Sequence, residues 1–198
     1  MSLSSPSTAT PTAPLKNIIF IGFMGTGKST LARSLNQTLN YPAIDTDQLI
    51  EKQTQRKITE IFATDGEETF RAMETALLQS MIDQNMDHHL IATGGGIITQ
   101  QKSRELLKEL GFVVWLRATP EEVLKRTSHT SHRPLLQCEN PMEVITDLMA
   151  AREEFYRSTS HLTIDTKDLA LDEISCGILE SARYHFAHPD GSSSDSPT

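Results

Sequence analysis

Apolar residues form two kinds of pattern along the chain, short continuous runs and residues spaced about four apart. The run "NIIFIG" (17–22) is apolar after Asn17 and predicts a buried strand. The segment after it carries Leu31, Leu35 and Leu39 at a spacing of four, which predicts a helix with one apolar face. The same apolar signal predicts four more strands, at "YPAIDTD" (41–47), "HLIATGGG" (89–96), "FVVWLRA" (112–118) and "HLTIDT" (161–166).

Helical patterns fill the intervals between these strands. In "TPEEVLKRT" (119–127), Thr119 is a predicted N-cap and Pro120 lies in the first turn. The other expected helices cover Glu67–Asn85 after a break at "ATDG" (63–66), Ser103–Leu110 before Gly111, Asn140–Arg157 with Val144, Leu148, Ala151 and Phe155 on one stripe, and a last helix with Leu171, Ile174 and Ile178. Strands separated by helices indicate parallel βαβ units, whose ligands gather at the carboxyl ends of the strands.

The stretch "GFMGTGKST" (22–30) follows the first predicted strand and opens the first predicted helix. It matches G-x-x-x-x-G-K-[ST] through Gly22, Gly27, Lys28 and Ser29, a loop whose backbone N–H groups hold phosphate. In this motif Lys28 reaches the β and γ phosphates and the Ser29 hydroxyl helps to hold Mg²⁺. The candidate ATP-binding residues of the loop are Gly25, Thr26, Gly27, Lys28, Ser29 and Thr30.

The predicted fold is therefore α/β, with three layers α/β/α around a central parallel sheet of about five strands. It is of the P-loop NTPase type and carries a mobile lid. The 198 residues suit one domain, expected over 16–186 with the lid at about 126–138. Polar segments at 1–15 and 187–198 are expected to be a flexible and a disordered tail.

Charge and apolar content exclude two classes of partner. The formal net charge is −8, and an acidic chain is a poor candidate for binding nucleic acid. The longest apolar runs, Ile18–Met24 and Phe112–Leu116, are too short to cross a bilayer. The chain shows neither a secretory leader nor paired cysteine spacing, so a cytoplasmic location is expected.

Acidic and basic side chains that suit a phosphoryl acceptor lie at the end of the second predicted strand and on the predicted helix after it. Asp45 and Asp47 lie two apart, so in an extended strand both carboxylates face the same way and can bind hydroxyls, take a proton or hold Mg²⁺. Either could act as the base. Arg71 can pair with Glu74 three residues on, either as an exposed salt bridge or so that Glu74 orients Arg71 toward a ligand carboxylate.

The set of motifs resembles the shikimate kinase family. It consists of "GFMGTGKST", "DTD" (45–47), "IFATDGEETFRAMET" (61–75), "GGG" (94–96), "RPLL" (133–136) and "AREEFYR" (151–157), in that order. The resemblance implies that Asp47 holds the acceptor hydroxyls and is the candidate base, with Asp45 nearer the Mg²⁺ shell. It implies that Arg71 and Arg152 clamp the acceptor carboxylate.

The same resemblance assigns the rest of the site. Gly94, Gly95 and Gly96 bring backbone close to the acceptor, and Phe62 and Phe70 form an apolar wall against its ring, although packing in the core would explain these two side chains equally well. Arg126 stacks near the adenine, and Arg133 in the lid meets the phosphates, so that Lys28, Asp47 and Arg133 are the catalytic set.

The implied reaction is ATP-dependent phosphorylation of the 3-hydroxyl of shikimate, a step of aromatic amino acid biosynthesis. It uses Mg²⁺ and small-molecule substrates alone, and the enzyme is expected to be a monomer. Two alternatives are another small-molecule kinase, such as a gluconate-type enzyme, and a nucleotide-binding relative without turnover.

Overall fold

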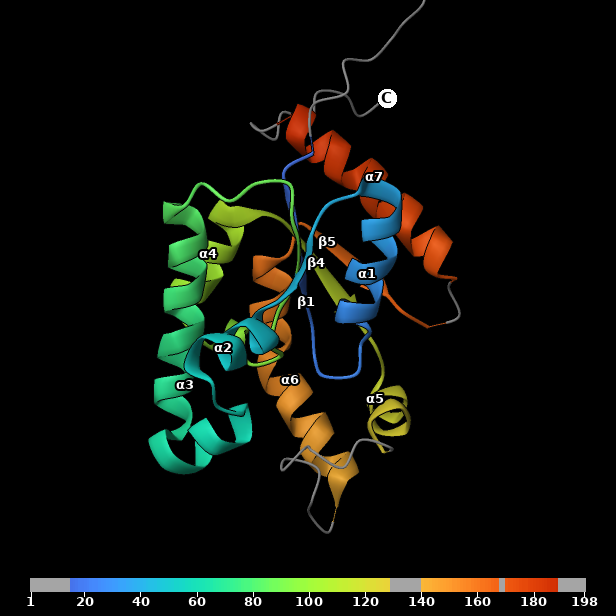
Figure 1. Cartoon of the computed structure of the whole chain (residues 1–198). Coiled ribbons are helices and arrows are strands. Elements are labelled where there is room, and N and C mark those ends of the chain that lie inside the picture. Colours follow the sequence, from blue (N-terminus) through green and yellow to red (C-terminus); the bar gives the residue numbers. More distant parts are fainter. Residues whose placement is uncertain (1–14, 129–139, 168–169, 189–198) are drawn as a thin grey trace, which may run out of the picture.

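The computed structural model describes residues 15–128, 140–167 and 170–188. It contains one five-stranded sheet in the order β2-β3-β1-β4-β5, and every neighbouring pair is parallel, which confirms the predicted α/β fold (Figure 1). In chain order the elements are β1 (Asn17–Ile21), α1 (Lys28–Leu39), β2 (Ala43–Asp45), α2 (Thr46–Thr54), α3 (Ile58–Asp83), β3 (Leu90–Ala92), the 3₁₀ turn η1 (Ile97–Thr99), α4 (Gln101–Leu110), β4 (Gly111–Arg117), α5 (Pro120–Thr127), α6 (Pro141–Thr159), β5 (Leu162–Asp165) and α7 (Leu171–Ala187).

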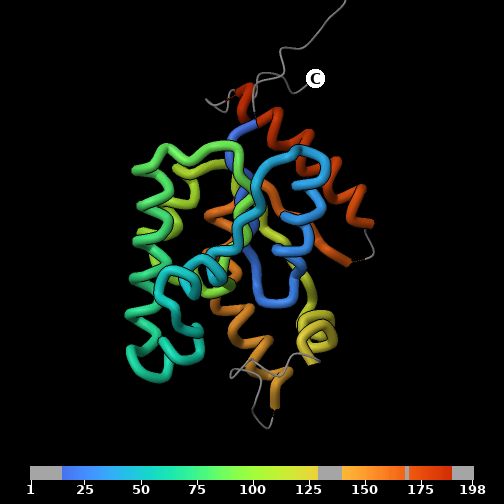
Figure 2. Tube along the Cα trace, viewed as in Figure 1, coloured from blue at the N-terminus to red at the C-terminus, as the bar shows by residue number. Residues whose placement is uncertain are grey.

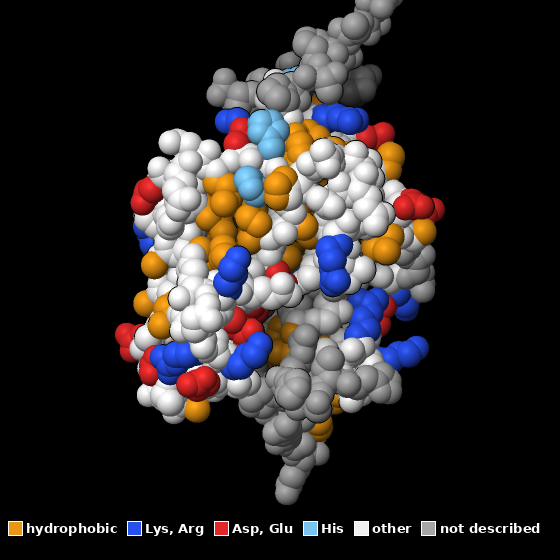
Figure 3. Space-filling view, viewed as in Figure 1, with side chains coloured by type: hydrophobic (Ala, Val, Ile, Leu, Met, Phe, Trp, Pro, Cys, Tyr) orange, Lys and Arg blue, Asp and Glu red, His pale blue; other side chains and the backbone are white. Residues whose placement is uncertain are grey.

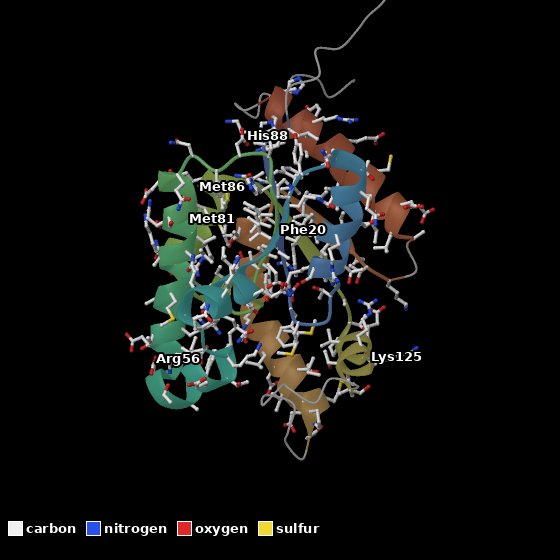
Figure 4. All side chains as sticks on the ribbon, viewed as in Figure 1. Phe20, Arg56, Met81, Met86, His88 and Lys125 are labelled. Carbon is white, nitrogen blue, oxygen red and sulfur yellow. The ribbon has the colours of Figure 1, made fainter. Side chains whose placement is uncertain are left out.

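Alternate residues of β1 serve the two faces of the sheet. Ile18 and Phe20 pack with α1 and α7, whereas Ile19 and Ile21 pack with α3, α4 and α6. Figures 1 and 2 show α1 and α7 on one side of the strands and α3 and α4 on the other. In Figure 4, Phe20 lies toward α1, while Met81 reaches the sheet from α3. The apolar run of β1 is therefore buried on both faces, as in other parallel sheets.

The loop after β1 lies at the carboxyl edge of the sheet. Figures 1 and 2 show this blue loop at the lower end of the strands, with α5, α6 and the short α2 around it. Phe23 of the loop packs with Val123 of α5 and Ile145 of α6 in a small cluster of its own. The phosphate loop and the ends of the other strands therefore share one edge, as the βαβ pattern predicts.

Three local predictions were incomplete or wrong. The segment after Asp45 forms the helix α2, which the apolar pattern did not predict. The break at "ATDG" is a bend inside α3, at Gly66 with φ 83° and ψ 167°, and helix precedes it from Ile58. On α6 the buried positions include Ile145 and Tyr156, while Ala151 of the expected stripe is exposed.

The outer end of α3 is held by charged pairs. Arg56 pairs with Asp65 at 2.7 Å, and Lys57 pairs with Glu51 at 2.8 Å. Side chains of both charges gather over this end of α3, at the lower left of Figure 3, where Figure 4 labels Arg56. The first pair joins the α2–α3 connection to the turn before Gly66, and the second joins that connection to α2.

No helix among residues 15–128, 140–167 and 170–188 is long and apolar enough to cross a membrane. Nearly all of the predicted tails, and the predicted lid beyond Ser128, lie outside the residues that the structure describes. The tails and the lid therefore stay predictions.

Asn17 joins three segments at the opposite, amino edge of the sheet. Its side chain is buried, donates to the carbonyls of Met86 at 2.7 Å and Leu110 at 2.9 Å, and accepts from the N–H of His89 at 2.9 Å. Asn17→Ala would strand these groups, so we expect the free energy of unfolding to fall by about 2–4 kcal/mol in urea titrations. Asn36→Ala is the control, because Asn36 donates a single bond, to Tyr41. A variant as stable as the parent would contradict this role.

Candidate active site

The phosphate loop is shaped by its glycines and by Lys28. Gly25 and Gly27 have φ of 76° and 95°, a region that side chains disfavour, so the loop needs glycine there. Lys28 begins α1, is buried, and its Nζ donates to the carbonyls of Gly22 and Phe23, each at 2.8 Å. The amino end of α1 and the Lys28 ammonium therefore place positive charge at the loop, which suits phosphate oxygens.

Arg126 connects the loop to the segment after β5. Its Nη1 donates to the Thr166 hydroxyl at 3.1 Å and, at a longer 3.4 Å, to the carbonyl of Gly25. A Cβ on Gly25 would lie 3.0 Å from the Thr127 side chain, so this glycine lets α5 approach the loop. Arg133, the other predicted lid arginine, lies outside the described residues.

The spacing of Asp45 and Asp47 predicted that they share one face of a strand, and this prediction is wrong. Asp45 ends β2 and caps α2, where its Oδ1 accepts from the backbone N–H groups of Asp47 and Gln48 at 3.1 and 3.3 Å. Its Oδ2 accepts from the Ser29 hydroxyl at 2.7 Å. Asp47 belongs to the first turn of α2, so the two carboxylates point to different parts of the site.

Asp47 and Glu74 converge at Gly94. A Cβ on Gly94 would lie 2.5 Å from Asp47 Oδ1 and 2.7 Å from Glu74 Oε1, so glycine is required here by close approach. Both oxygens are buried, and within the described part of the chain neither has a hydrogen-bond partner. Burial, with the nearby Asp45 carboxylate, raises the pKa of Asp47 to about 6, and burial raises the pKa of Glu74 to about 7 against the opposing charge of Arg71.

Arg71 is held by two carboxylates and two aromatic rings. Its Nη1 donates to Glu74 Oε2 at 2.6 Å, and its Nη2 and Nε donate to Glu67 Oε1 at 2.8 and 3.2 Å. The guanidinium carbon lies 5.5 and 5.8 Å from the ring centroids of Phe70 and Phe62. These contacts exclude an exposed ion pair of little consequence, because the Glu74 side chain is completely buried.

Arg71 packs against Gly96, and Arg152 contacts Gly95. A Cβ on Gly96 would overlap the Arg71 guanidinium. Arg152 of α6 donates to the Gly95 carbonyl at 3.4 Å, and the Tyr156 hydroxyl donates to the same oxygen at 2.6 Å. Arg71 and Arg152 thus approach the Gly94–Gly96 segment from α3 and α6, as two arginines acting on one carboxylate would.

Three contributors were not predicted from the sequence. The buried Thr46 hydroxyl accepts from the N–H of Gly94 at 3.2 Å, Tyr156 fixes Gly95, and Glu67 occupies Arg71. Glu67 could have been found, because it precedes Arg71 by four positions on a predicted helix. Asp45 with Gln48 three residues on fits the N-cap pattern, so the start of α2 could have been found, although not the bond from Gly94 to Thr46. Tyr156 carried no comparable signal.

Together, a five-stranded parallel sheet, a phosphate loop after β1 and a facing set of two acids and two arginines define a P-loop phosphotransferase. Comparison with known proteins narrows this class. The family model described as shikimate kinase matches residues 24–183. The chain therefore belongs to the shikimate kinase family.

Individual relatives agree with this assignment. The chain is 40% identical over 167 residues to the shikimate kinase of Caldanaerobacter subterraneus subsp. tengcongensis, covering 84% of this chain and 96% of the relative. It is 41% identical over 175 residues to that of Acinetobacter baumannii (strain AYE), covering 88% and 95%. The solved structure of the Acinetobacter baumannii enzyme in complex with shikimate aligns with a TM-score of 0.79 and 40% identity, covering 85% of this chain and 93% of that one.

Proposed function

We propose that this protein transfers the γ-phosphoryl group of ATP to the 3-hydroxyl of shikimate. The observation that carries the proposal is the meeting of Asp47, Glu74 and Arg71 at Gly94–Gly96, at the sheet edge that also carries the phosphate loop. The Asp47 carboxylate can accept hydrogen bonds from hydroxyl groups, and the Arg71 guanidinium beside it can bind a carboxylate. This pair of functions suits a small acid that carries hydroxyl groups. A relative solved in complex with shikimate supports the same acceptor.

On the donor side, the loop N–H groups and Lys28 hold the phosphates of ATP. Lys28 offsets charge on the γ-phosphoryl group as it transfers, and Arg133 of the lid adds a second positive charge. Arg126, which already contacts both Gly25 and Thr166, packs beside the adenine. Catalysis is then mainly positioning and electrostatic stabilisation.

Ser29 and Asp45 suit a magnesium ion bound with ATP. Both offer oxygen ligands, and the 2.7 Å bond between Ser29 Oγ and Asp45 Oδ2 places them side by side at the start of α1. When bound, Mg²⁺ neutralises phosphate charge. The protein itself supplies a hydroxyl and a carboxylate that are already oriented, with Asp45 also fixed as the cap of α2.

On the acceptor side, Asp47 Oδ1 holds the reacting hydroxyl and takes its proton. Arg71 and Arg152 bind the carboxylate, Phe62 and Phe70 support the ring, and Glu74 orients Arg71. Tyr156 keeps the Gly95 carbonyl in place beside Arg152. We expect the enzyme to act as a cytoplasmic monomer.

An acceptor panel tests the proposal directly. ADP release is measured with MgATP and shikimate, gluconate, a nucleoside monophosphate or no acceptor. We expect ADP release above background only when shikimate is the acceptor. Turnover with gluconate but none with shikimate would favour the gluconate-type alternative, and binding of ATP without any turnover would favour an inactive relative.

A further inference from the structure

We propose that Glu67 is a placeholder for the acceptor carboxylate on Arg71. Before the acceptor binds, Glu67 occupies part of the guanidinium, and the acceptor carboxylate displaces it. Glu67 then lowers the affinity for the acceptor. This inference rests on the proposed function, because it concerns the same acceptor site.

The contacts of Arg71 show which edge Glu67 takes. A single oxygen, Oε1 of Glu67, accepts from both Nη2 and Nε, whereas Glu74 accepts from Nη1. The Nε and Nη2 donors lie side by side and point the same way, so they can bind both oxygens of a carboxylate at once. Glu67 fills this edge with one oxygen, which is a weaker use of it than a bidentate ligand would make.

The two carboxylates on Arg71 differ in how easily they can leave. The Glu67 side chain is 60% exposed, whereas that of Glu74 is 0% exposed. Releasing an exposed carboxylate to water costs little, but releasing Glu74 would strand a buried group. Glu67 also lines an open groove of about 470 Å³, together with Glu68, Thr75 and Thr99, so there is solvent space into which its side chain can turn.

The bend in α3 holds Glu67 in this position. Gly66, at φ 83°, interrupts the helix, and the next section begins with Glu67 one turn before Arg71. A carboxylate in a first helical turn and four residues before an arginine is favoured by both the helix dipole and the spacing. A structural role, in which Glu67 orients Arg71 for the acceptor, has the same geometry but the opposite effect on affinity.

Glu67→Gln separates the two roles. Acceptor binding is measured by calorimetry on the full chain, with KM and kcat from steady-state assays. Glu68→Gln is the matched control, because Glu68 lines the same groove and removal of its charge reports general electrostatics. We expect Glu67→Gln to lower the Kd and KM for shikimate about two- to fivefold, as for loss of an exposed ion pair. Glu68→Gln should change the Kd and KM for shikimate little, and neither variant should change the KM for ATP appreciably.

A shikimate carboxamide gives a further readout, since it lacks the charge that competes with Glu67. Glu67→Gln should not improve its binding. If the parent binds and phosphorylates shikimate but Glu67→Gln binds it equally or more weakly, the placeholder role is overturned and the proposed function stands. A parent that does not use shikimate would overturn both.

Discussion

Asp47→Asn is expected to lower kcat by about 10²–10⁴-fold, the usual contribution of a positioned general base. The asparagine keeps the size of the side chain and its place in the first turn of α2 but cannot accept the proton of the hydroxyl. We expect a much smaller effect on the KM for ATP, because Asp47 Oδ1 lies against Gly94 and Glu74, although Lys28 of the phosphate loop is near enough to lower the pKa of Asp47. Steady-state kinetics with shikimate and ATP varied in turn measures both quantities.

The pH dependence provides a second measurement on the same carboxylate. Burial raises the pKa of Asp47 to about 6, and only the ionised form acts as a base. For the parent, kcat/KM for shikimate should therefore fall as the pH drops through about 6, toward tenfold per pH unit. Asp47→Asn should lose this limb of the profile.

Folding stability should move differently from activity. The pKa of Asp47 is higher in the folded chain than its ordinary 3.8, so the folded form favours the protonated carboxyl. The resulting stabilisation is present below pH 3.8 and is lost as the pH rises through about 6. A neutral asparagine avoids that loss, and we expect Asp47→Asn to be at least as stable as the parent at pH 7 by thermal unfolding.

Two further variants decide which aspartate is the base. Asp45→Asn keeps a residue that can cap α2, so we expect it to alter the Mg²⁺ dependence more than the pH profile. Asp83→Asn, at the exposed end of α3, is the neutral control. If Asp47→Asn retained most of the parent's kcat while Asp45→Asn abolished it, the assignment of the base to Asp47 would be wrong.

The different positions of Asp45 and Asp47 also show which features of the site could not be predicted from the sequence. All five strands were predicted, most clearly β1, β3 and β4, because a strand buried on both faces has almost no polar position to obscure the apolar run. The edge strands β2 and β5 are only partly buried, so their apolar signal is weaker. Asp45 and Asp47 were placed on a strand because β2 is only three residues long and its end carries no apolar marker. Two residues apart means the same side in a strand but different sides in a helix, so one boundary error changed the geometry of the acceptor site.

Side chains that meet across the fold were harder to predict than motifs that are contiguous. The phosphate loop could be identified because all its parts lie within nine residues. The buried contact of Asp47, Glu74 and Gly94 joins three elements, and the bond from Tyr156 to Gly95 spans 61 residues. Propensity and period do not encode such contacts, which depend on how α3 and α6 pack over the sheet.

Arg71→Ala is expected to raise the KM for shikimate about 10- to 150-fold, from the loss of a charge-assisted hydrogen bond of about 1.5–3 kcal/mol. The KM for ATP should change little, because the contacts of Arg71 are with Glu67, Glu74, the two phenylalanines and Gly96. Arg71→Lys keeps the charge without the planar fork, so it should recover only part of the affinity. Arg157→Ala, which removes an exposed arginine paired with Glu153, is the control.

The loss of Arg71 should leave the chain folded, because the Glu74 carboxylate can take up a proton and become neutral. Burial already raises the pKa of Glu74 to about 7 with Arg71 beside it, and removing that positive charge raises the pKa further. Glu74 should therefore be protonated at pH 7 in Arg71→Ala, which avoids a buried unpaired charge. The double variant with Glu74→Gln should then match the single variant in stability at that pH.

These two outcomes separate acceptor binding from folding. A large rise in the shikimate KM, with a melting temperature that Glu74→Gln no longer changes, would mean that Arg71 binds the acceptor and that Glu74 only orients it. An unchanged shikimate KM would instead mean that Arg71 serves only as the internal partner of Glu67 and Glu74. In that case Arg152, which donates to the same Gly95 carbonyl as Tyr156, would have to bind the carboxylate alone.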